Sequence, residues 1–443
     1  MVAVDDYRLI ADALAEDIAA GRLRPGDRLP PQRSFARARG IASSTAARVY
    51  GELVRRGLAT GEVGRGTFVR AAAPLGQPAL SEPAGARVDL ELNFSVLPEQ
   101  PALLAAGLAG LVRSDALAPA LAPVTVTGPP GAREVAVPVL ARAGWAPEPE
   151  RVLFAGNGRQ AIAAAIAALV PVGERLGVEA LTYPVVKGIA ARLGVTLVPL
   201  PMDEHGLVPE ALRGARVRAV YVQPTLHNPL GVTMPPARRA ELAAVLDELE
   251  LFAVEDAVYS FLREDPAPLA ALAPARTVVV ESLSKRLSPG LTLGFVVAPP
   301  GAVADRVANA LRAGGWAAGG FALAAATRWM ADGTTTALVR AKQRDAAERQ
   351  LIAGKILRGY ALCADPHAYH CWWELPEPWR AETFVAAAAR HGIAVTPAAA
   401  FAVGPAHSPN AVRLALAAPP VDALSAALET LAALARGEYA GPE

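Results

Sequence analysis

The chain has 443 residues, of which 53% are hydrophobic and 19% are charged, with two cysteines and a formal net charge of +1. This length and composition predict a globular protein of two or three domains, and they exclude a disordered chain and a disulfide-stapled secreted domain. The N-terminus does not resemble a secretory signal, and no apolar run is long enough to span a membrane, so we expect a cytoplasmic protein.

The first 70 residues predict a winged helix-turn-helix. A helix is expected over residues 5–20, ended by Gly21, and "PQRSFARAR" predicts a short helix ended by Gly40. "SSTAARVYGELVRRG" predicts a second helix with Ser43 or Ser44 as its N-cap, and "LATGEVGRGTFV" predicts two strands around a glycine turn. Three helices followed by a hairpin are typical of a winged helix.

The charge of this region points to DNA. Residues 33–70 hold eight arginines and only two acids, which is the local electrostatic footprint of a nucleic-acid surface. A solvated helix face is the alternative explanation of such arginines, but the order of helix, turn, helix and glycine-tipped hairpin favours binding to double-stranded DNA at the nucleoid. The candidate DNA-binding residues are Arg33, Ser43, Ser44, Thr45, Arg48 and Arg65.

Residues 71–88 are rich in Pro, Ala and Gly and predict a linker. From residue 89 to 443, strand-like runs such as "VRAVYVQP" and "RTVVVESLS" alternate with alanine-rich helices. That alternation predicts an α/β domain with a mostly parallel sheet, followed from about residue 330 by a smaller α+β part.

Only four lysines occur among 43 basic residues, and Lys285 follows a predicted strand. A lysine can become a neutral amine and attack a carbonyl, whereas an arginine cannot. Pyridoxal 5′-phosphate (PLP) needs such an amine, a carboxylate for the pyridine nitrogen, donors for the phenolate oxygen and a phosphate nest. Candidates for the carboxylate, the phenolate donors, the phosphate nest and a tyrosine that stacks on the ring follow other predicted strands or open a helix. They are Gly158, Arg159, Gln160, Tyr183, Asn228, Asp256, Tyr259, Ser282 and Ser284.

Each of these signals alone has an ordinary structural explanation, such as a turn, a cap or a solvated lysine. Their order at successive strand ends favours a cofactor site. "DPHAYHC", with His367, His370 and Cys371, has no standard zinc spacing, so we expect no metal site.

Two resemblances make these expectations specific. "GRLRPGDRLPPQRSFARARGIASSTAARVYGELVRRGLATGEVGRGTFV" resembles the DNA-binding domain of GntR-type bacterial transcription regulators. "SLSKRLSPGLTLG", "VEDAVYSFL" and "HNPLG" resemble segments of the fold type I aminotransferases. The second resemblance implies Lys285 as the Schiff-base lysine, Asp256 on the pyridine nitrogen, Asn228 and Tyr259 on the phenolate oxygen, and Arg413 as the clamp for a ligand carboxylate.

One position departs from the aminotransferase pattern. The arginine that commonly grips the phosphate in "P-G-L-R-x-G" is Thr292 here, and Arg286 is a candidate substitute. The combination of domains resembles the MocR subgroup of GntR regulators. It implies a head-to-tail homodimer that binds promoter DNA and senses PLP, an amino acid or an amine through an aldimine at Lys285. A working aminotransferase and a cofactor-free dimerisation scaffold remain the alternatives, so enzymatic activity stays open.

Overall fold

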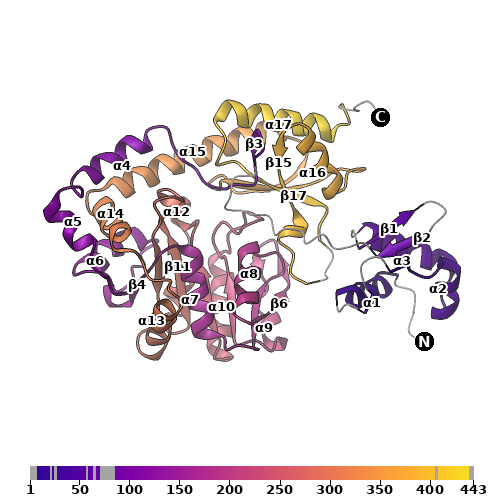
Figure 1. Cartoon of the computed structure of the whole chain (residues 1–443), viewed down its shortest axis with the longest axis horizontal. Helices are drawn as coiled ribbons and strands as arrows, with labels where there is room; N and C mark the ends of the chain where they lie inside the picture. The colour runs from indigo at the N-terminus through magenta and orange to yellow at the C-terminus, as the bar shows by residue number, and fades with distance from the viewer. Residues whose placement is uncertain are drawn as a thin grey trace. The chain divides into compact units, whose positions relative to one another are not determined.

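The computed structural model describes residues 7–19, 22–23, 27–55, 58–62, 66–69, 85–404 and 408–438. The chain divides into two compact units, and the division falls within the predicted linker, between residues 78 and 79 (Figure 1). Most of that linker lies outside the described residues, so its predicted bounds stay a prediction.

The first unit contains the predicted three helices and hairpin. They are α1 (Tyr7–Ala19), α2 (Gln32–Arg39), α3 (Ser43–Arg55), β1 (Ala59–Glu62) and β2 (Gly66–Val69). Apolar residues at helical spacing, among them Leu14, Phe35, Val49 and Leu53, form one buried core. Gly40 ends α2 with a φ of 65°, as predicted, because a left-handed residue at this position favours glycine.

The second unit is built on a seven-stranded sheet with the order β4-β12-β11-β10-β9-β5-β6. The strands are β4 (Val152–Ala155), β5 (Arg175–Glu179), β6 (Thr196–Leu200), β9 (Ala219–Val222), β10 (Phe252–Asp256), β11 (Thr277–Ser282) and β12 (Gly294–Val297). β12 runs antiparallel to both of its neighbours, and the neighbouring pairs from β11 to β6 are parallel. This confirms the predicted mostly parallel sheet.

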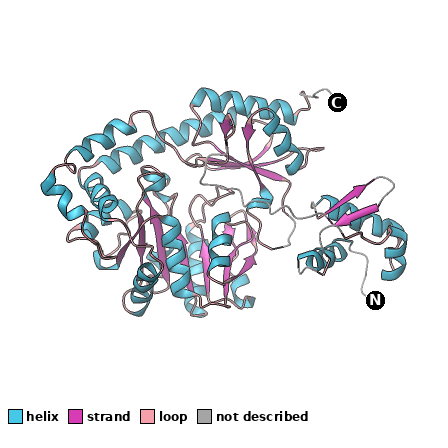
Figure 2. Ribbon diagram, in the orientation of Figure 1, coloured by secondary structure: helices cyan, strands magenta, loops and turns pink. Residues whose placement is uncertain are grey.

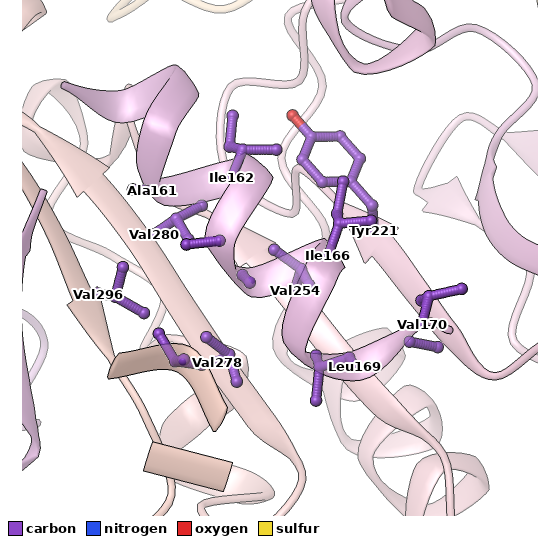
Figure 3. Close-up of a cluster of buried hydrophobic side chains, with 14 of the residues drawn as sticks. Ala161, Ile162, Ile166, Leu169, Val170, Tyr221, Val254, Val278, Val280 and Val296 are labelled. Atoms are coloured by element: carbon purple, nitrogen blue, oxygen red, sulfur yellow. The ribbon is translucent and has the colours of Figure 1, made fainter. Parts of the chain in front are cut away.

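Apolar side chains alternate between the two faces of the sheet along its strands, which explains why helices cover both faces. Val278 and Val280 of β11 pack with the helix α7 (Gly158–Leu169), as Figure 3 shows. Val279, between them, belongs to the cluster on the opposite face. Successive side chains point to opposite sides of a strand, and β11 is buried along its whole length.

The helices of this unit cover the sheet and connect it to the C-terminal part (Figure 2). The helices besides α7 are α4 (Gln100–Ala109), α5 (Ser114–Ala120), α6 (Ala132–Leu140), α8 (Pro184–Arg192), α9 (Ala211–Gly214), α10 (Pro236–Glu248), α11 (Leu269–Leu272), α12 (Leu283–Arg286), α13 (Ala302–Ala313), α14 (Gly320–Ala331), α15 (Thr334–Ile356), α16 (Ala381–Arg390) and α17 (Val421–Ala435). No single helix among the described residues is long and apolar enough to cross a membrane; α4 and α5 together reach that length and composition, but they meet at 99°.

The C-terminal part confirms the predicted smaller α+β region. Its sheet has the order β13-β14-β17-β16 and packs with α15, α16 and α17. The strands are β13 (Ala361–Ala364), β14 (His370–Glu374), β16 (Thr396–Pro397) and β17 (Ala411–Ala415). The strand β3 (Val88–Asp89), which precedes the large sheet in sequence, pairs in parallel with β15 (Ile393–Ala394). Two short strands, β7 (Met202–Asp203) and β8 (Gly206–Leu207), form a separate hairpin.

Candidate functional site

A cavity of about 360 Å³ lies where several strands of the large sheet end, a size that suits a small-molecule site. Asp256 ends β10, Lys285 lies in α12 directly after β11, and α7 begins just after β4. Nine of the predicted cofactor and effector residues line this cavity. They are Gly158, Arg159, Tyr183, Asn228, Asp256, Tyr259, Ser284, Lys285 and Arg413.

Lys285 faces this cavity. Its Nζ donates to the backbone oxygen of Asn93 at 2.6 Å and lies 3.3 Å from the centroid of the Phe94 ring. Burial, and then the charge of Arg413, hold the pKa of Lys285 well below its usual range, while Asp256 opposes that shift. A lowered pKa leaves more of the amine neutral, which is the form that attacks a carbonyl.

Asp256 is buried and held by three donors. Its Oδ2 accepts from the Tyr221 hydroxyl at 2.5 Å and from Gln223 Nε2 at 3.1 Å, and its Oδ1 accepts from the Val258 amide at 3.1 Å. Burial raises the pKa of Asp256 to about 6, against the effect of these hydrogen bonds. Such a carboxyl is well placed to take a cationic ring nitrogen, because that partner would relieve the cost of the buried charge.

Tyr259 and Asn228 lie at the same cavity as donors. The Tyr259 hydroxyl accepts from Asn93 Nδ2 at 2.9 Å, and burial raises the pKa of Tyr259, so its proton is retained for donation. Asn228 Oδ1 accepts from Arg413 Nη1 at 3.4 Å. That hydrogen bond turns the amide oxygen to the arginine and leaves the Asn228 NH₂ group as a donor.

The start of α7 provides an anion cradle. A side chain at Gly158 would place its Cβ 2.9 Å from the Cβ of Ser282, so the helix can approach the end of β11 only with glycine there. Ser282 Oγ lies 3.0 Å from both Ser284 Oγ and Thr292 Oγ1, which both line the cavity. Free N–H groups at a helix start and hydroxyls beside them suit a phosphate.

Two predicted phosphate ligands are placed differently from the expectation. The Gln160 amide donates to Asn157 Oδ1 at 3.0 Å as a helix cap, and Gln160 does not line the cavity. Ser282 does not line the cavity either. Its hydroxyl is hydrogen-bonded to Ser284 and Thr292, which do line it. The anion cradle therefore offers the amides of Gly158 and Arg159 rather than three amides.

Arg286 does not replace the arginine missing at Thr292. Its guanidinium is buried, forms an ion pair with Glu281 and lies 5.3 Å over the Phe261 ring. Successive residues of a helix point about 100° apart, so Arg286 faces away from the cavity that Lys285 faces. This placement corrects the expectation that Arg286 binds the phosphate.

Arg413 is 1% exposed and lies at another part of the cavity wall. Its Nη2 donates to the Glu91 backbone oxygen at 2.6 Å and to Thr396 Oγ1 at 3.0 Å. Its Nε has no hydrogen-bond partner among the described residues. A buried guanidinium with an unused donor is typical of a site for an external carboxylate.

The segment 91–95, which we call the strap, was not predicted as part of the site. Three alternate backbone oxygens of the strap accept from three basic side chains. They are Glu91 O from Arg413 at 2.6 Å, Asn93 O from Lys285 at 2.6 Å, and Ser95 O from Lys342 at 2.8 Å. Lys342 of α15 also donates to the backbone oxygens of Lys285 and Leu287, at 2.9 and 2.6 Å.

The histidines near the cavity do not form a metal site. His370 Nε2 donates to the His227 backbone oxygen at 3.0 Å, and burial lowers the pKa of His370 to about 3. Within the described ranges, no group of three or more His, Cys, Asp or Glu side chains could hold a metal ion.

These residues fit PLP. The cavity combines an amine of lowered pKa, a buried carboxyl for the pyridine nitrogen, a hydroxyl and an amide for the phenolate oxygen, and the cradle between α7 and Ser284. The unpartnered Nε of Arg413 and the unpartnered Oδ1 of Asn93 are further buried groups that a bound molecule could satisfy.

Four of the predicted DNA-binding residues are exposed on the helices α2 and α3 of the first unit. Ser43, Ser44 and Arg48 of α3 are exposed and Thr45 is half-buried, while Ala46, Val49 and Leu53 turn into the core. Arg33 is exposed near the start of α2. Arg65 lies outside the described residues, so the predicted contact from the hairpin tip is not described. The exposed side chains of Ser43, Ser44 and Arg48 are therefore the part of α3 that is accessible to a groove of DNA.

Comparison with known proteins assigns both units to families. The gntR family of bacterial regulatory proteins matches residues 6–69, and the aminotransferase class I and II family matches residues 138–431. The uncharacterized HTH-type transcriptional regulator YdeF of Bacillus subtilis (strain 168) is 30% identical over 420 residues, which cover 93% of this chain and 90% of YdeF. The probable rhizopine catabolism regulatory protein MocR of Rhizobium meliloti is 26% identical and aligns over 66% of this chain and 65% of MocR. The chain belongs to the MocR subgroup of GntR-type transcription regulators.

Another relative and a solved structure agree with this assignment. The HTH-type transcriptional regulator TauR of Rhodobacter capsulatus is 31% identical over 334 residues, 68% of each chain. The crystal structure of an archaeal alanine:glyoxylate aminotransferase superposes with a TM-score of 0.72 at 22% identity, covering 80% of this chain and 91% of that one. The second unit of this MocR-type regulator therefore has the aminotransferase fold, and proteins with that fold typically depend on PLP.

Proposed function

We propose that the protein is a PLP-dependent transcription regulator. Its first unit binds promoter DNA through α3, and its second unit senses PLP, or an amino acid or amine, through a covalent link to Lys285. The observation that carries this proposal is the cavity in which Lys285, Asp256 and the start of α7 meet, in a chain that also carries a winged helix. A head-to-tail homodimer in the cytoplasm, at the nucleoid, belongs to the same proposal.

When bound, PLP supplies an aldehyde that condenses with amines and a ring that withdraws electrons. Lys285 holds the amine for that condensation, and Asp256 holds the proton of the pyridine nitrogen. Tyr259 and Asn228 donate toward the phenolate oxygen. The amides of Gly158 and Arg159, with Ser284 and Thr292, bind the phosphate.

Arg159 supplies the positive charge at the phosphate. It lies at the start of α7 and lines the cavity, where its side chain is hydrogen-bonded to Tyr183. Arg413 is the other arginine of the cavity lining, but it is fixed to the strap and to Thr396. A phosphate dianion in a partly closed cavity needs a nearby cation, and Arg159 is the arginine left for it.

The proposal is tested with purified full-length protein and its Lys285→Ala variant. Each is titrated with PLP and followed by visible absorbance, and each is used to select duplexes from a random-sequence DNA pool. We expect a visible band that is lost in the variant, and an enriched DNA sequence in the selection. No band in the unsubstituted protein, or no enriched sequence, would contradict the proposal.

Transamination is the second candidate function. The groups that an aminotransferase needs, including Lys285, Asp256, Tyr259 and Arg413, all line one cavity, so the chain has the parts for turnover. Release of a keto acid from an amino acid over many turnovers, measured with the PLP-loaded protein, would favour this function.

A further inference from the structure

The charged side chains that line the cavity are not all used by the cofactor. Among the described residues they are Glu91, Arg159, Asp256, Glu281, Lys285 and Arg413. Glu281 is neutralised by its ion pair with Arg286. In the proposed function, PLP occupies Lys285, Asp256 and Arg159. Two charges of opposite sign, Arg413 and Glu91, are left for the effector.

Glu91 lies directly beside Arg413. Its backbone oxygen accepts from Arg413 Nη2 at 2.6 Å. Glu91 also lines the cavity, together with Arg413, the arginine proposed to bind the ligand carboxylate. No hydrogen bond or ion pair of the Glu91 carboxyl is found among the described residues. Burial and the charge of Asp89 both raise the pKa of Glu91, and Arg413 opposes them. A half-buried acid close to another acid gains from a cationic partner.

We propose that the effector is an amino acid that carries a second cationic group, with its carboxylate on Arg413 and its side-chain cation on Glu91. This rests on the proposed function. A ligand with a carboxylate alone would bring a further negative charge to a site where Glu91 and Asp89 already lie close to Arg413. A second cation on the ligand balances that charge, and the side-chain cation distinguishes basic from neutral amino acids.

The test compares L-ornithine with L-norvaline, which share a five-carbon chain and differ in the terminal amine of ornithine. Each is titrated into the full-length, PLP-loaded protein, with the visible spectrum as the readout for binding. The same titrations are made with Glu91→Gln and with the control Glu99→Gln, since Glu99 is exposed and does not line the cavity.

We expect ornithine to bind at least roughly tenfold more tightly than norvaline, because a hydrogen bond to a charged group contributes roughly tenfold to a hundredfold in affinity. Glu91→Gln should remove this preference, because it should weaken the binding of ornithine while the binding of norvaline stays the same or becomes tighter. Glu99→Gln should keep it. A PLP band equal to that of the unsubstituted protein shows that the Glu91 variant is folded.

Two results would overturn the inference. One is equal affinity for the two amino acids in the unsubstituted protein. The other is a Glu91→Gln variant that retains the preference for ornithine. Both leave the proposed function standing, because the PLP band and the selected DNA sequence are measured separately. Loss of the band itself would instead contradict the proposed function.

Discussion

At the residue scale, the proposed phosphate site lacks the arginine of the aminotransferase pattern and relies on Arg159 instead. Thr292 occupies the position where an arginine is common, and it is hydrogen-bonded to Ser282 at the cradle. Arg286, the candidate substitute directly after Lys285 in the sequence, forms an ion pair with Glu281 instead. In the proposed function, the charge at the phosphate comes from Arg159 at the start of α7, where the macrodipole also favours an anion.

Arg159→Gln should weaken PLP binding by roughly tenfold to a hundredfold, because a charge-assisted hydrogen bond is lost. The double variant Arg159→Gln with Thr292→Arg should recover most of the affinity, since it returns an arginine to the cradle from the other side. Titration of the visible band measures both. A double variant no better than the single one would show that Arg159 does not supply this charge.

Asp256 makes the stability of the cofactor-free protein depend on pH. Its pKa is about 6 in the folded protein and near 3.8 in the unfolded chain, so between these values the folded state holds a proton that the unfolded state has lost. The contribution is full below about pH 4 and is lost as the pH rises to about 6, by roughly 3 kcal/mol.

Asp256→Asn removes this titration while keeping the shape of the side chain. The free energy of unfolding, measured by urea denaturation from pH 4 to 7 for both proteins, should fall more steeply for the unsubstituted protein. Parallel curves for the two proteins would show that the pKa of Asp256 is not raised in the folded protein.

At the element scale, the strap and α15 are joined through one buried lysine. Lys342 is fully buried and donates to the backbone oxygens of Ser95, Lys285 and Leu287. It therefore fixes the segment that carries Lys285 and the end of the strap in one place. Its role is positional, because it does not line the cavity.

Lys342→Met should lower the free energy of unfolding by roughly 3 kcal/mol or more, because an unpaired buried acceptor costs about 1–3 kcal/mol. Hydrogen exchange of the peptide that contains residues 91–97 should also become faster. The control is Lys355→Met in the last turn of the same helix, where the lysine is exposed. Equal effects of the two substitutions would rule out a special role for Lys342.

The helix α3 makes a different prediction, for DNA. Arg48 is exposed on the face that carries Ser44, one helical turn earlier. Arg48→Ala should lower affinity for the selected duplex by about 1–3 kcal/mol if the side chain reads a base, with relaxed specificity at one position. Arg306→Ala, an exposed arginine of the second unit, should leave DNA affinity unchanged. An unchanged affinity for the Arg48 variant would place the DNA contacts on another face.

At the scale of the whole molecule, the sequence predicts the elements with strong local patterns. The α7 glycine turn, the β-branched run of β11 and the three helices of the first unit all have such patterns. β5 and β6 were not among the predicted strands, because "RLGVE" contains a glycine and "TLVPL" a proline, and β6 is a partly exposed edge strand. A glycine or a proline inside a short strand therefore hides it from a prediction based on local pattern, whether the strand lies at the edge, as β6 does, or inside the sheet, as β5 does.

Local sequence pattern also explains which residues of the candidate site could be predicted. Lys285, Asp256 and Arg413 lie in recognisable segments, so they could be predicted. The strap could not, because Asn93 meets Lys285 across 192 residues of sequence and contributes a backbone oxygen, which any residue has. Tyr221 and Gln223, the partners of Asp256, offered a weaker signal: they lie at the end of a predicted strand, where parallel strands bring side chains together.

The proposed function requires ligand binding at Lys285 and DNA binding at α3 to be thermodynamically coupled. Coupling between two sites is typically about 1–3 kcal/mol, or roughly 5- to 150-fold in affinity, and it is reciprocal. A ligand that binds both states equally would shift nothing.

The most direct measurement is the affinity of the full-length protein for its selected duplex, with and without saturating PLP, beside the Lys285→Ala variant at the same salt concentration. We expect PLP to change the affinity of the unsubstituted protein for DNA by roughly fivefold or more, and we expect the affinity of the variant to stay the same. A protein that shows the visible PLP band but binds DNA with the same affinity in both conditions would contradict this expectation.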